Sequence, residues 1–304
     1  MSDPVVSIII ITCNRPFLLR HCIDRVLQQS YPYKEIIVVD SSTDDASERL
    51  VACYPQVLAV RLCGQRNNMP AARNRGIALA SGEIIAFIDD DSMVQPGWLE
   101  ALVDVYRDES VGAAGGRIIT MPYPYCDQLT GLPSLTVSSS GRVFAQGTGL
   151  LSAMQCDVDH LIGCNMSFRR SVLEQMGGFD VNYTLTNLRE ETDLCVRVKK
   201  AGWRIIFHPA IAVIHFSARS LQPYFLERPS IQFSNGRNCT YFAIKHFGLN
   251  AHTVTGQLID TARCCGRAAY FASLFSIGAA AQITGRIVGV VEGIRWLMNS
   301  QQRL

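Results

Sequence analysis

Short runs of aliphatic, mostly β-branched residues alternate with helix-forming segments in the first third of this chain. Runs that are apolar on every residue are typical of strands buried on both faces of a parallel sheet. The alternation therefore predicts right-handed βαβ units and a largely parallel sheet covered by helices. The predicted strands are residues 7–11, 36–39, 57–62 and 84–88, and the predicted helices between them include residues 17–29 and 70–80.

Polar residues follow three of these strands directly. Residues 12–15 follow the first strand, Asp40 follows the second, and residues 89–91 follow the fourth. The carboxyl ends of parallel strands meet at one edge of an open sheet, and ligands bind there. We therefore expect these three segments to converge on a single crevice although they are far apart in the sequence.

Asp89, Asp90 and Asp91 are adjacent carboxylates that repel one another unless a cation lies among them. Mg²⁺ and Mn²⁺ take oxygen ligands and are often held by one or two carboxylates beside substrate phosphates. The alternative is a solvated acidic turn that caps the helix near Trp98. Because the triplet comes directly after a buried strand, we favour a site for Mn²⁺ or Mg²⁺ with a phosphate group.

A second acidic cluster begins the helix predicted over residues 190–201, and it contains Glu190, Glu191 and Asp193. Acidic residues in a first turn complement the helix dipole, which is a sufficient reason for such a cluster. The functional alternative is a general base that takes the proton of an attacking hydroxyl. Acids on one helical turn point in different directions, so only one of them can hold that role.

Arg73 and His215 are two further candidates. Arg73 lies on a predicted helix rich in small residues, where its guanidinium could donate to a phosphate or a base carbonyl, or simply form a basic exposed face. His215 ends the second of two short strands predicted at residues 203–207 and 211–214. A lone histidine at a strand end is more often structural than a metal ligand.

Composition narrows the class of protein. Hydrophobic residues make up 48% of the chain and charged residues 18%, which indicates a folded protein. The net charge of +2 gives no reason to expect a nucleic-acid partner. The 11 cysteines contain no C-x-x-C pair, so we expect reduced thiols without a zinc site. The first residues show no secretory signal, which favours a cytoplasmic location.

The C-terminal tail is apolar and basic. From Arg263 onward the chain contains five arginines and a single acid, Glu292, and residues 268–285 carry no charge. This stretch is at the lower length limit for a membrane-spanning helix. It could also form surface-bound helices with arginines at the lipid headgroups, or a helical hairpin packed on the domain. We favour surface helices, which would make the protein peripheral on the cytoplasmic face of a membrane.

Residues 121–160 break the regular pattern with clusters of Pro, Gly and Ser. Such a long irregular segment is usually a functional loop or a flap over a site. We expect this segment, together with the tail, to select the acceptor substrate.

Seven motifs follow one another between Val5 and His215, and any one of them alone would be weak. They are SIIIITCNRP, EIIVVDSST, NMPAARNRGI, GEIIAFIDDDS, GCNMSFRRSVLEQMGGFD, REETDLCVRVKKAGWRI and VIHFS. In this order they resemble the family 2 glycosyltransferases. The resemblance implies the GT-A fold, a Rossmann-like α/β fold with a largely parallel mixed sheet, over residues 1–240. Residues 241–304 would form a helical, membrane-associated extension.

The resemblance also implies which residues bind the donor. Thr12, Asn14 and Arg15 would line the nucleotide pocket, Asp40 would read the pyrimidine edge, and Arg73 would contact the nucleotide.

Roles in the metal site and in catalysis follow from the same resemblance. Asp89 would hold the ribose or assist the metal, Asp91 would bind the metal at the diphosphate, and His215 would complete its shell. Asp90 belongs to the donor site without a specific role. The Glu-Asp pair of the family falls on Glu190 and Glu191, so Glu191 is the expected base, with Glu190 and Asp193 as alternatives.

The expected reaction is an inverting transfer from a nucleoside diphosphate sugar to a hydroxyl acceptor. UDP or dTDP is favoured because a short acid such as Asp40 suits a pyrimidine imide. The product would belong to a polysaccharide, a lipid-linked oligosaccharide or another glycoconjugate. A nucleotidyltransferase should carry a Gly-rich basic loop after the first strand, where this chain has TCNRP. A non-catalytic partner that binds sugar nucleotides is the other alternative.

Overall fold

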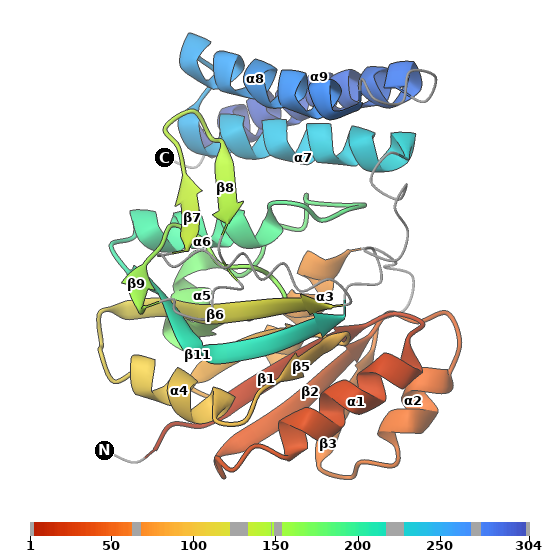
Figure 1. Cartoon of the computed structure of the whole chain (residues 1–304), viewed down its shortest axis with the longest axis vertical. Helices are drawn as coiled ribbons and strands as arrows, with labels where there is room; N and C mark the ends of the chain where they lie inside the picture. Colours follow the sequence, from red (N-terminus) through yellow and green to blue (C-terminus); the bar gives the residue numbers. More distant parts are fainter. Residues whose placement is uncertain are drawn as a thin grey trace.

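A twisted sheet with helices on both faces forms the body of the protein, and a layer of helices covers one end of it (Figure 1). The structure is a computed structural model, and it describes residues 3–62, 68–121, 133–146, 148, 154–216, 228–268 and 275–301.

The main sheet contains the strands β1 (Val6–Thr12), β2 (Lys34–Asp40), β3 (Val57–Arg61), β4 (Ile84–Asp89), β5 (Ser92–Val94), β6 (Val111–Met121), β9 (Cys156–Asp157), β10 (Met166–Arg169) and β11 (Arg204–Phe216). A separate hairpin pairs β7 (Ser134–Val137) with β8 (Val143–Gln146). The helices of the body are α1 (Pro16–Leu27), α2 (Ala46–Val51), α3 (Met69–Leu79), α4 (Trp98–Val105), α5 (Arg170–Met176) and α6 (Glu190–Lys200). The end layer consists of α7 (Pro229–Phe247), α8 (Ala251–Ala268) and α9 (Phe275–Gln301).

The strand order confirms the predicted fold class. Along the sheet the order is β3-β2-β1-β4-β10-β6-β11-β5, and β9 pairs with β11. Strands β3, β2, β1 and β4 are parallel neighbours, and β6 is parallel to β11. Only β10, β5 and β9 pair in antiparallel fashion with their neighbours in this sheet. The sheet is therefore mixed and largely parallel.

Side-chain alternation explains why β1 is apolar along its whole length. Ile8 and Ile10 belong to the core under α1 and α4, whereas Ile9 and Ile11 belong to the core under α3, α5 and α6. All four are buried. A strand covered by helices on both faces needs apolar side chains at odd and even positions alike.

The two strands predicted around residue 208 are one continuous strand, β11. Its pairing with β6 shifts register between His208 and Val213, around Pro209, which has no N–H to donate. Gly116 on β6 lies opposite this bulge. A Cβ at Gly116 would meet the carbonyl oxygens of His208 and Ile211 at 2.2 Å, so a side chain there would push the two strands apart.

The boundary predicted at residue 240 falls inside α7, the first helix of the end layer. Glycines of α9 press against α7: a Cβ at Gly285 would meet the Phe233 carbonyl oxygen at 1.9 Å, and one at Gly289 would meet that of Arg237 at 2.4 Å. Residues 269–274 of the charge-free stretch lie outside the described residues. Within the part of the chain that is described, no helix is both long and apolar enough to cross a membrane.

The segment predicted to be irregular contains the β7–β8 hairpin, which reaches from the body up to the end layer (Figure 1). Arg142 of the hairpin forms a 2.8 Å ion pair with Asp260 of α8, and Ser139 lies 3.0 Å from the His252 ring. Residues 122–132, 147 and 149–153 of this segment lie outside the described residues.

Candidate active site

The polar residues that follow β1, β2 and β4 converge at one edge of the sheet, as the sequence predicts. Thr12 at the end of β1 pairs in register with Asp40 at the end of β2. On the other side of β1, Ile11 pairs with Asp89 at the end of β4. The parallel register places all three chain segments at the same carboxyl edge.

Asp90, which had no specific role in the sequence interpretation, connects two chain segments at this edge of the sheet through buried contacts. Its buried carboxylate accepts a 2.7 Å hydrogen bond from the Thr12 hydroxyl and forms a 2.7 Å ion pair with Arg15. Burial raises the pKa of Asp90 to about 7, although the Arg15 charge and the Thr12 hydrogen bond oppose that rise. Asp90 thus ties the loop after β1 to the end of β4, and the Thr12 hydroxyl points into this contact.

Asp89, Asp91 and His215 form a group that can hold a metal ion. One ligand atom from each residue lies within 4.8 Å of the others, and the His215 Nε2 atom is 3.2 Å from an Asp91 carboxylate oxygen. His215 lies on β11, opposite Ser92 of β5. Because β5 begins directly after the acidic triplet, this pairing brings His215 close to Asp91. Two carboxylates and one imidazole are a ligand set that suits Mn²⁺, and the geometry fits a divalent ion.

Arg15 also contacts Asp91, one of the two carboxylates of this group. Its guanidinium donates a 2.7 Å hydrogen bond to Asp91. Burial alone would raise the pKa of Asp91, but His215 and Arg15 outweigh it and hold the pKa below its ordinary value. Asp91 is therefore kept ionised, which is the form that binds a cation.

Asn14 joins the loops after β1 and β2, and Asp40 lies at the start of the second loop. Asn14 has a left-handed backbone with φ 56°, and its side-chain oxygen accepts a 2.9 Å hydrogen bond from the Thr43 amide. One Asp40 oxygen accepts from the Ser42 amide at 2.8 Å. The other, Oδ2, is buried and has no hydrogen-bond partner among the residues that the structure describes. It is the kind of atom that a ligand donor would satisfy.

Arg73 lies in the interior, where it links the triplet to α6. It is 1% exposed, its Nη2 atom is 3.3 Å from Asp89, and its Nη1 atom pairs with Glu190. It also donates to the Gly163 carbonyl at 3.3 Å. Burial lowers the pKa of Arg73 against the opposing charges of its acidic neighbours. Its role in binding the nucleotide stays a prediction, since its guanidinium is already engaged by protein groups.

The acids of α6 differ in their surroundings. Glu190 is buried against Arg73, and Asp193 is buried against cations of α6 and α7. Glu191 is partly exposed and forms no ion pair with any described residue. Its negative charge, like that of Asp89, opposes the lowering of the Arg73 pKa by burial. The helix begins after Arg189, whose φ of 80° turns the chain sharply into α6.

The surroundings of Asp193 could not be foreseen from the motif. Its carboxylate contacts Arg197 at 2.9 Å, and Lys245 and His246 of α7 at 2.7 Å each. Lys245 also pairs with Asp180 at 2.6 Å. Lys245 and His246 lie outside the seven motifs, in a stretch of sequence without a recognisable pattern, and their contacts with Asp193 hold α6 against α7.

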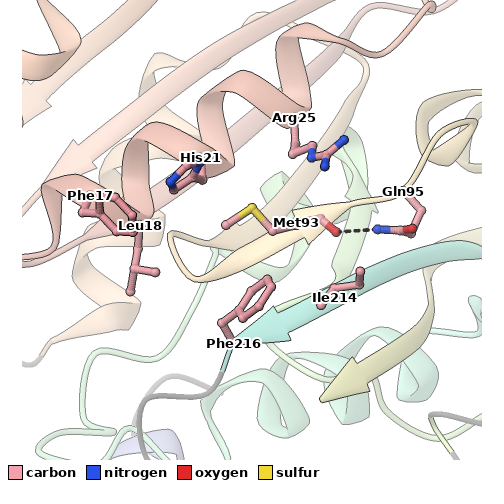
Figure 2. A pocket seen from close by; sticks show the side chains of 8 residues that line it. All are labelled: Phe17, Leu18, His21, Arg25, Met93, Gln95, Ile214 and Phe216. Atoms are coloured by element: carbon pink, nitrogen blue, oxygen red, sulfur yellow. Dashed lines mark hydrogen bonds between the residues drawn. The ribbon is translucent and has the colours of Figure 1, made fainter. Parts of the chain in front are cut away.

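A cavity of about 360 Å³ lies beside the site, between α1, β5 and the end of β11. Figure 2 shows its lining, which is mostly apolar with His21 and Arg25 on α1. Ile214 and Phe216 line it from β11. They flank His215 and project to the opposite face of the strand, so the β5–β11 ladder separates this cavity from the metal-ligating group.

Comparison with known proteins identifies the class defined by this fold and site. A family model described as glycosyl transferase family 2 matches residues 7–177. The chain therefore belongs to glycosyl transferase family 2, and the resemblance predicted from the motifs is confirmed.

Two curated relatives are each 27% identical to the chain. One is the glucosyl-dolichyl phosphate glucuronosyltransferase of Haloferax volcanii, with 202 residues aligned that cover 64% of this chain and 62% of the relative. The other is the N-acetylglucosaminyl-diphospho-decaprenol L-rhamnosyltransferase of Mycobacterium tuberculosis, with coverages of 72% and 78%. The chain thus spans less than two thirds of the Haloferax protein.

A solved structure confirms the GT-A fold. The mannosyltransferase PcManGT from Pyrobaculum calidifontis, in complex with GDP-Man and Mn²⁺, superposes with a TM-score of 0.58 at 18% identity. The superposition covers 95% of this chain and 88% of that one.

Proposed function

We propose that this chain is an inverting, metal-dependent glycosyltransferase that moves a sugar from a nucleoside diphosphate sugar to a hydroxyl acceptor. The observation that carries this proposal is the convergence of Asp89, Asp91 and His215 at the carboxyl edge of the sheet, in a member of glycosyl transferase family 2. Mn²⁺ or Mg²⁺ bound there would neutralise the diphosphate leaving group as a Lewis acid.

Glu191 is the proposed general base. It is the acid of the α6 cluster without an ion pair among the described residues, so its carboxylate is free to accept the proton of an acceptor hydroxyl. Arg73 and Glu190 hold the start of α6 next to Asp89, which would place the base close to the donor. An attack in line with the leaving diphosphate inverts the anomeric carbon.

The donor is proposed to carry a pyrimidine nucleotide, UDP or dTDP. The buried Asp40 Oδ2 atom can accept a hydrogen bond from the imide N–H of uracil or thymine. Arg15, which already lies at the metal-ligating group, can donate to the diphosphate.

The proposed acceptor is a sugar hydroxyl of a lipid-linked or polysaccharide glycan, and the proposed partner is the cytoplasmic face of a membrane. The names of the two curated relatives include glucosyl-dolichyl phosphate and N-acetylglucosaminyl-diphospho-decaprenol. The tail from Arg263 onward carries a net charge of +4, which favours an anionic membrane surface.

A product assay tests this function against its alternatives. The protein is incubated with Mn²⁺, a panel of sugar nucleotides and membrane extracts as the source of acceptors, and the nucleotide products are separated. We expect release of a nucleoside diphosphate that depends on Mn²⁺ and stops with a chelator. Release of pyrophosphate would instead indicate a nucleotidyltransferase, and donor binding without turnover would indicate a non-catalytic partner.

A further inference from the structure

The α9 helix meets α7 through glycines, and four of its large apolar residues face outward. Gly285, Gly289 and Gly293 recur every four residues on the face that meets α7. A Cβ at Gly293 would come within 2.7 Å of Ile244, and on α7 a Cβ at Gly236 would meet the Gln282 carbonyl oxygen at 2.3 Å. The two helix backbones are therefore in close contact.

The opposite face of α9 is an exposed apolar stripe. Ile283, Ile287, Val291 and Met298 are 50%, 60%, 45% and 62% exposed. Their spacing of four, four and seven residues puts them on one side of the helix. Helices that pack in water place large apolar residues inward, whereas helices in lipid often meet through glycines and turn large residues outward.

The neighbouring helix α8 adds to the exposed apolar surface. Val254, Leu258 and Ile259 are exposed on it. Figure 1 shows α8 and α9 at the end of the molecule farthest from β3, and the two helices contact each other and α7. Several large apolar side chains exposed on one helix face are unusual for a soluble monomer unless another surface covers them.

The charges of the two helices favour an anionic partner. Asp260 of α8 pairs with Arg142 of the β7–β8 hairpin, and Glu292 of α9 pairs with Arg237 of α7, each at 2.8 Å. Both acids are thus neutralised by cations of neighbouring elements, while Arg295 of α9 is exposed. A face with an apolar stripe, neutralised acids and an exposed arginine suits lipid headgroups better than a basic or neutral protein surface.

We propose that the outward face of α8 and α9, with the stripe Ile283, Ile287, Val291 and Met298 at its centre, lies on the surface of an anionic lipid bilayer. The inference rests on the proposed membrane partner and names the face that meets it. In this arrangement the stripe would lie in the interfacial region, with the axis of α9 along the bilayer surface.

Flotation of the full-length protein with vesicles tests the proposal. The vesicles contain phosphatidylcholine alone or phosphatidylcholine mixed with phosphatidylglycerol. We expect flotation with the mixed vesicles and a loss of about tenfold or more in the double variant Ile283→Ser/Ile287→Ser, because two apolar side chains no longer enter the interface. Arg295→Gln should weaken binding to the mixed vesicles about fivefold, from the charge of one arginine near an anionic surface.

Leu58→Ser provides the matched control. Leu58 is 49% exposed on β3, at the far edge of the sheet, and its variant should float like the wild type. If the double variant also floats like the wild type, the α9 stripe is not the membrane face. If the wild type floats with neither vesicle, and sedimentation shows a dimer that the double variant abolishes, the stripe is an interface between two copies and the proposal is wrong.

Nucleoside diphosphate release in the absence of vesicles separates this proposal from the proposed function. With water in place of an acceptor, the double variant should hydrolyse the sugar nucleotide at the wild-type rate. Wild-type turnover combined with no vesicle binding would reject the membrane face and leave the glycosyltransferase assignment standing.

Discussion

At the scale of single residues, two acids two positions apart on α6 have opposite surroundings. Glu191 is partly exposed and without an ion pair in the described structure, whereas Asp193 is buried and held by Arg197, Lys245 and His246. A general base must be free to take a proton from an acceptor, and Asp193 is not. Surroundings rather than residue type therefore separate the two candidates.

Glu191→Gln and Asp193→Asn should fail in different ways. Glu191→Gln should lower kcat about 10²- to 10⁴-fold, since it removes the base, and should leave donor affinity and melting temperature unchanged. Asp193→Asn should cost about 3–5 kcal/mol of folding free energy, because it leaves buried cations without their counter-charge. Steady-state kinetics and thermal unfolding of both variants provide the measurement. A stable Asp193→Asn protein without activity would shift the base assignment to Asp193.

Asp91→Ala should abolish the metal dependence of donor binding. Asp91 is the carboxylate that faces both His215 and Asp89, so its loss removes the centre of the metal-ligating group. Calorimetric titration with a sugar nucleotide should show that Mn²⁺ tightens binding to the wild type and has no effect on the variant. Glu109→Ala, at an exposed acid after α4, is the control and should keep the Mn²⁺ effect. An undiminished Mn²⁺ effect in Asp91→Ala would contradict the site.

At the scale of elements, close backbone contacts decide how strands and helices fit together. Gly116 leaves room for the β11 bulge around Pro209, and the glycines of α9 leave room for α7. Neither contact follows from local propensity, because glycine weakens a strand or a helix when it has no neighbour to accommodate. The sequence therefore predicted two short strands where β11 is continuous.

Gly285→Ala should loosen the end layer. The added Cβ would lie 1.9 Å from the Phe233 carbonyl oxygen, and α9 would have to move away from α7. Overpacking of this kind costs about 1–3 kcal/mol, so the melting temperature should fall and protease cleavage in α9 should become faster. Thr284→Ala, at the exposed neighbouring position, should change neither. Equal stability of the two variants would show that α9 is not packed as described.

At the scale of the whole molecule, a buried charge network joins the catalytic half to the end layer. Asp193 and Asp180 on the body side meet Lys245 and His246 on α7. Burial opposes the ionisation of both carboxyls, but it is outweighed and the pKa of each lies below its ordinary value. The hydrogen bond with His246 and the charges of Lys245 and Arg197 act on Asp193, and Lys245 acts on Asp180. Burial also lowers the pKa of His246, despite the nearby Asp193 charge.

The network predicts that stability declines in acid. His246 takes up a proton more readily in the unfolded chain, whose histidine pKa is about 6.5, so stability falls as the pH drops below that value. The two carboxyls add a second loss below about pH 4, where the unfolded chain protonates first. Urea unfolding between these pH values should show a slope of at most about 1.4 kcal/mol per pH unit from His246. His246→Gln should flatten the slope between pH 5 and pH 7, since glutamine does not titrate; an unchanged slope there would assign it to another group.

The sequence by itself determined the α/β class, the parallel half of the sheet and the edge at which the acidic triplet lies. These follow from apolar runs and from the rule that loops after parallel strands share one edge, which are local features. The sequence alone therefore predicts that Thr12, Asp40 and Asp89 lie together, and the strand register agrees.

Only the tertiary structure decided what each polar side chain does at that edge. In the structure Asp90 is buried and accepts a hydrogen bond from Thr12. Arg73 is buried between Asp89 and Glu190, and Glu191 has no ion pair among the described residues. Each of these outcomes depends on partners distant in the sequence, brought together by strand order and helix packing. The local sequence pattern determines at which edge of the sheet a residue lies. Burial and the charges of residues distant in the sequence determine whether its side chain can bind a ligand or take a proton.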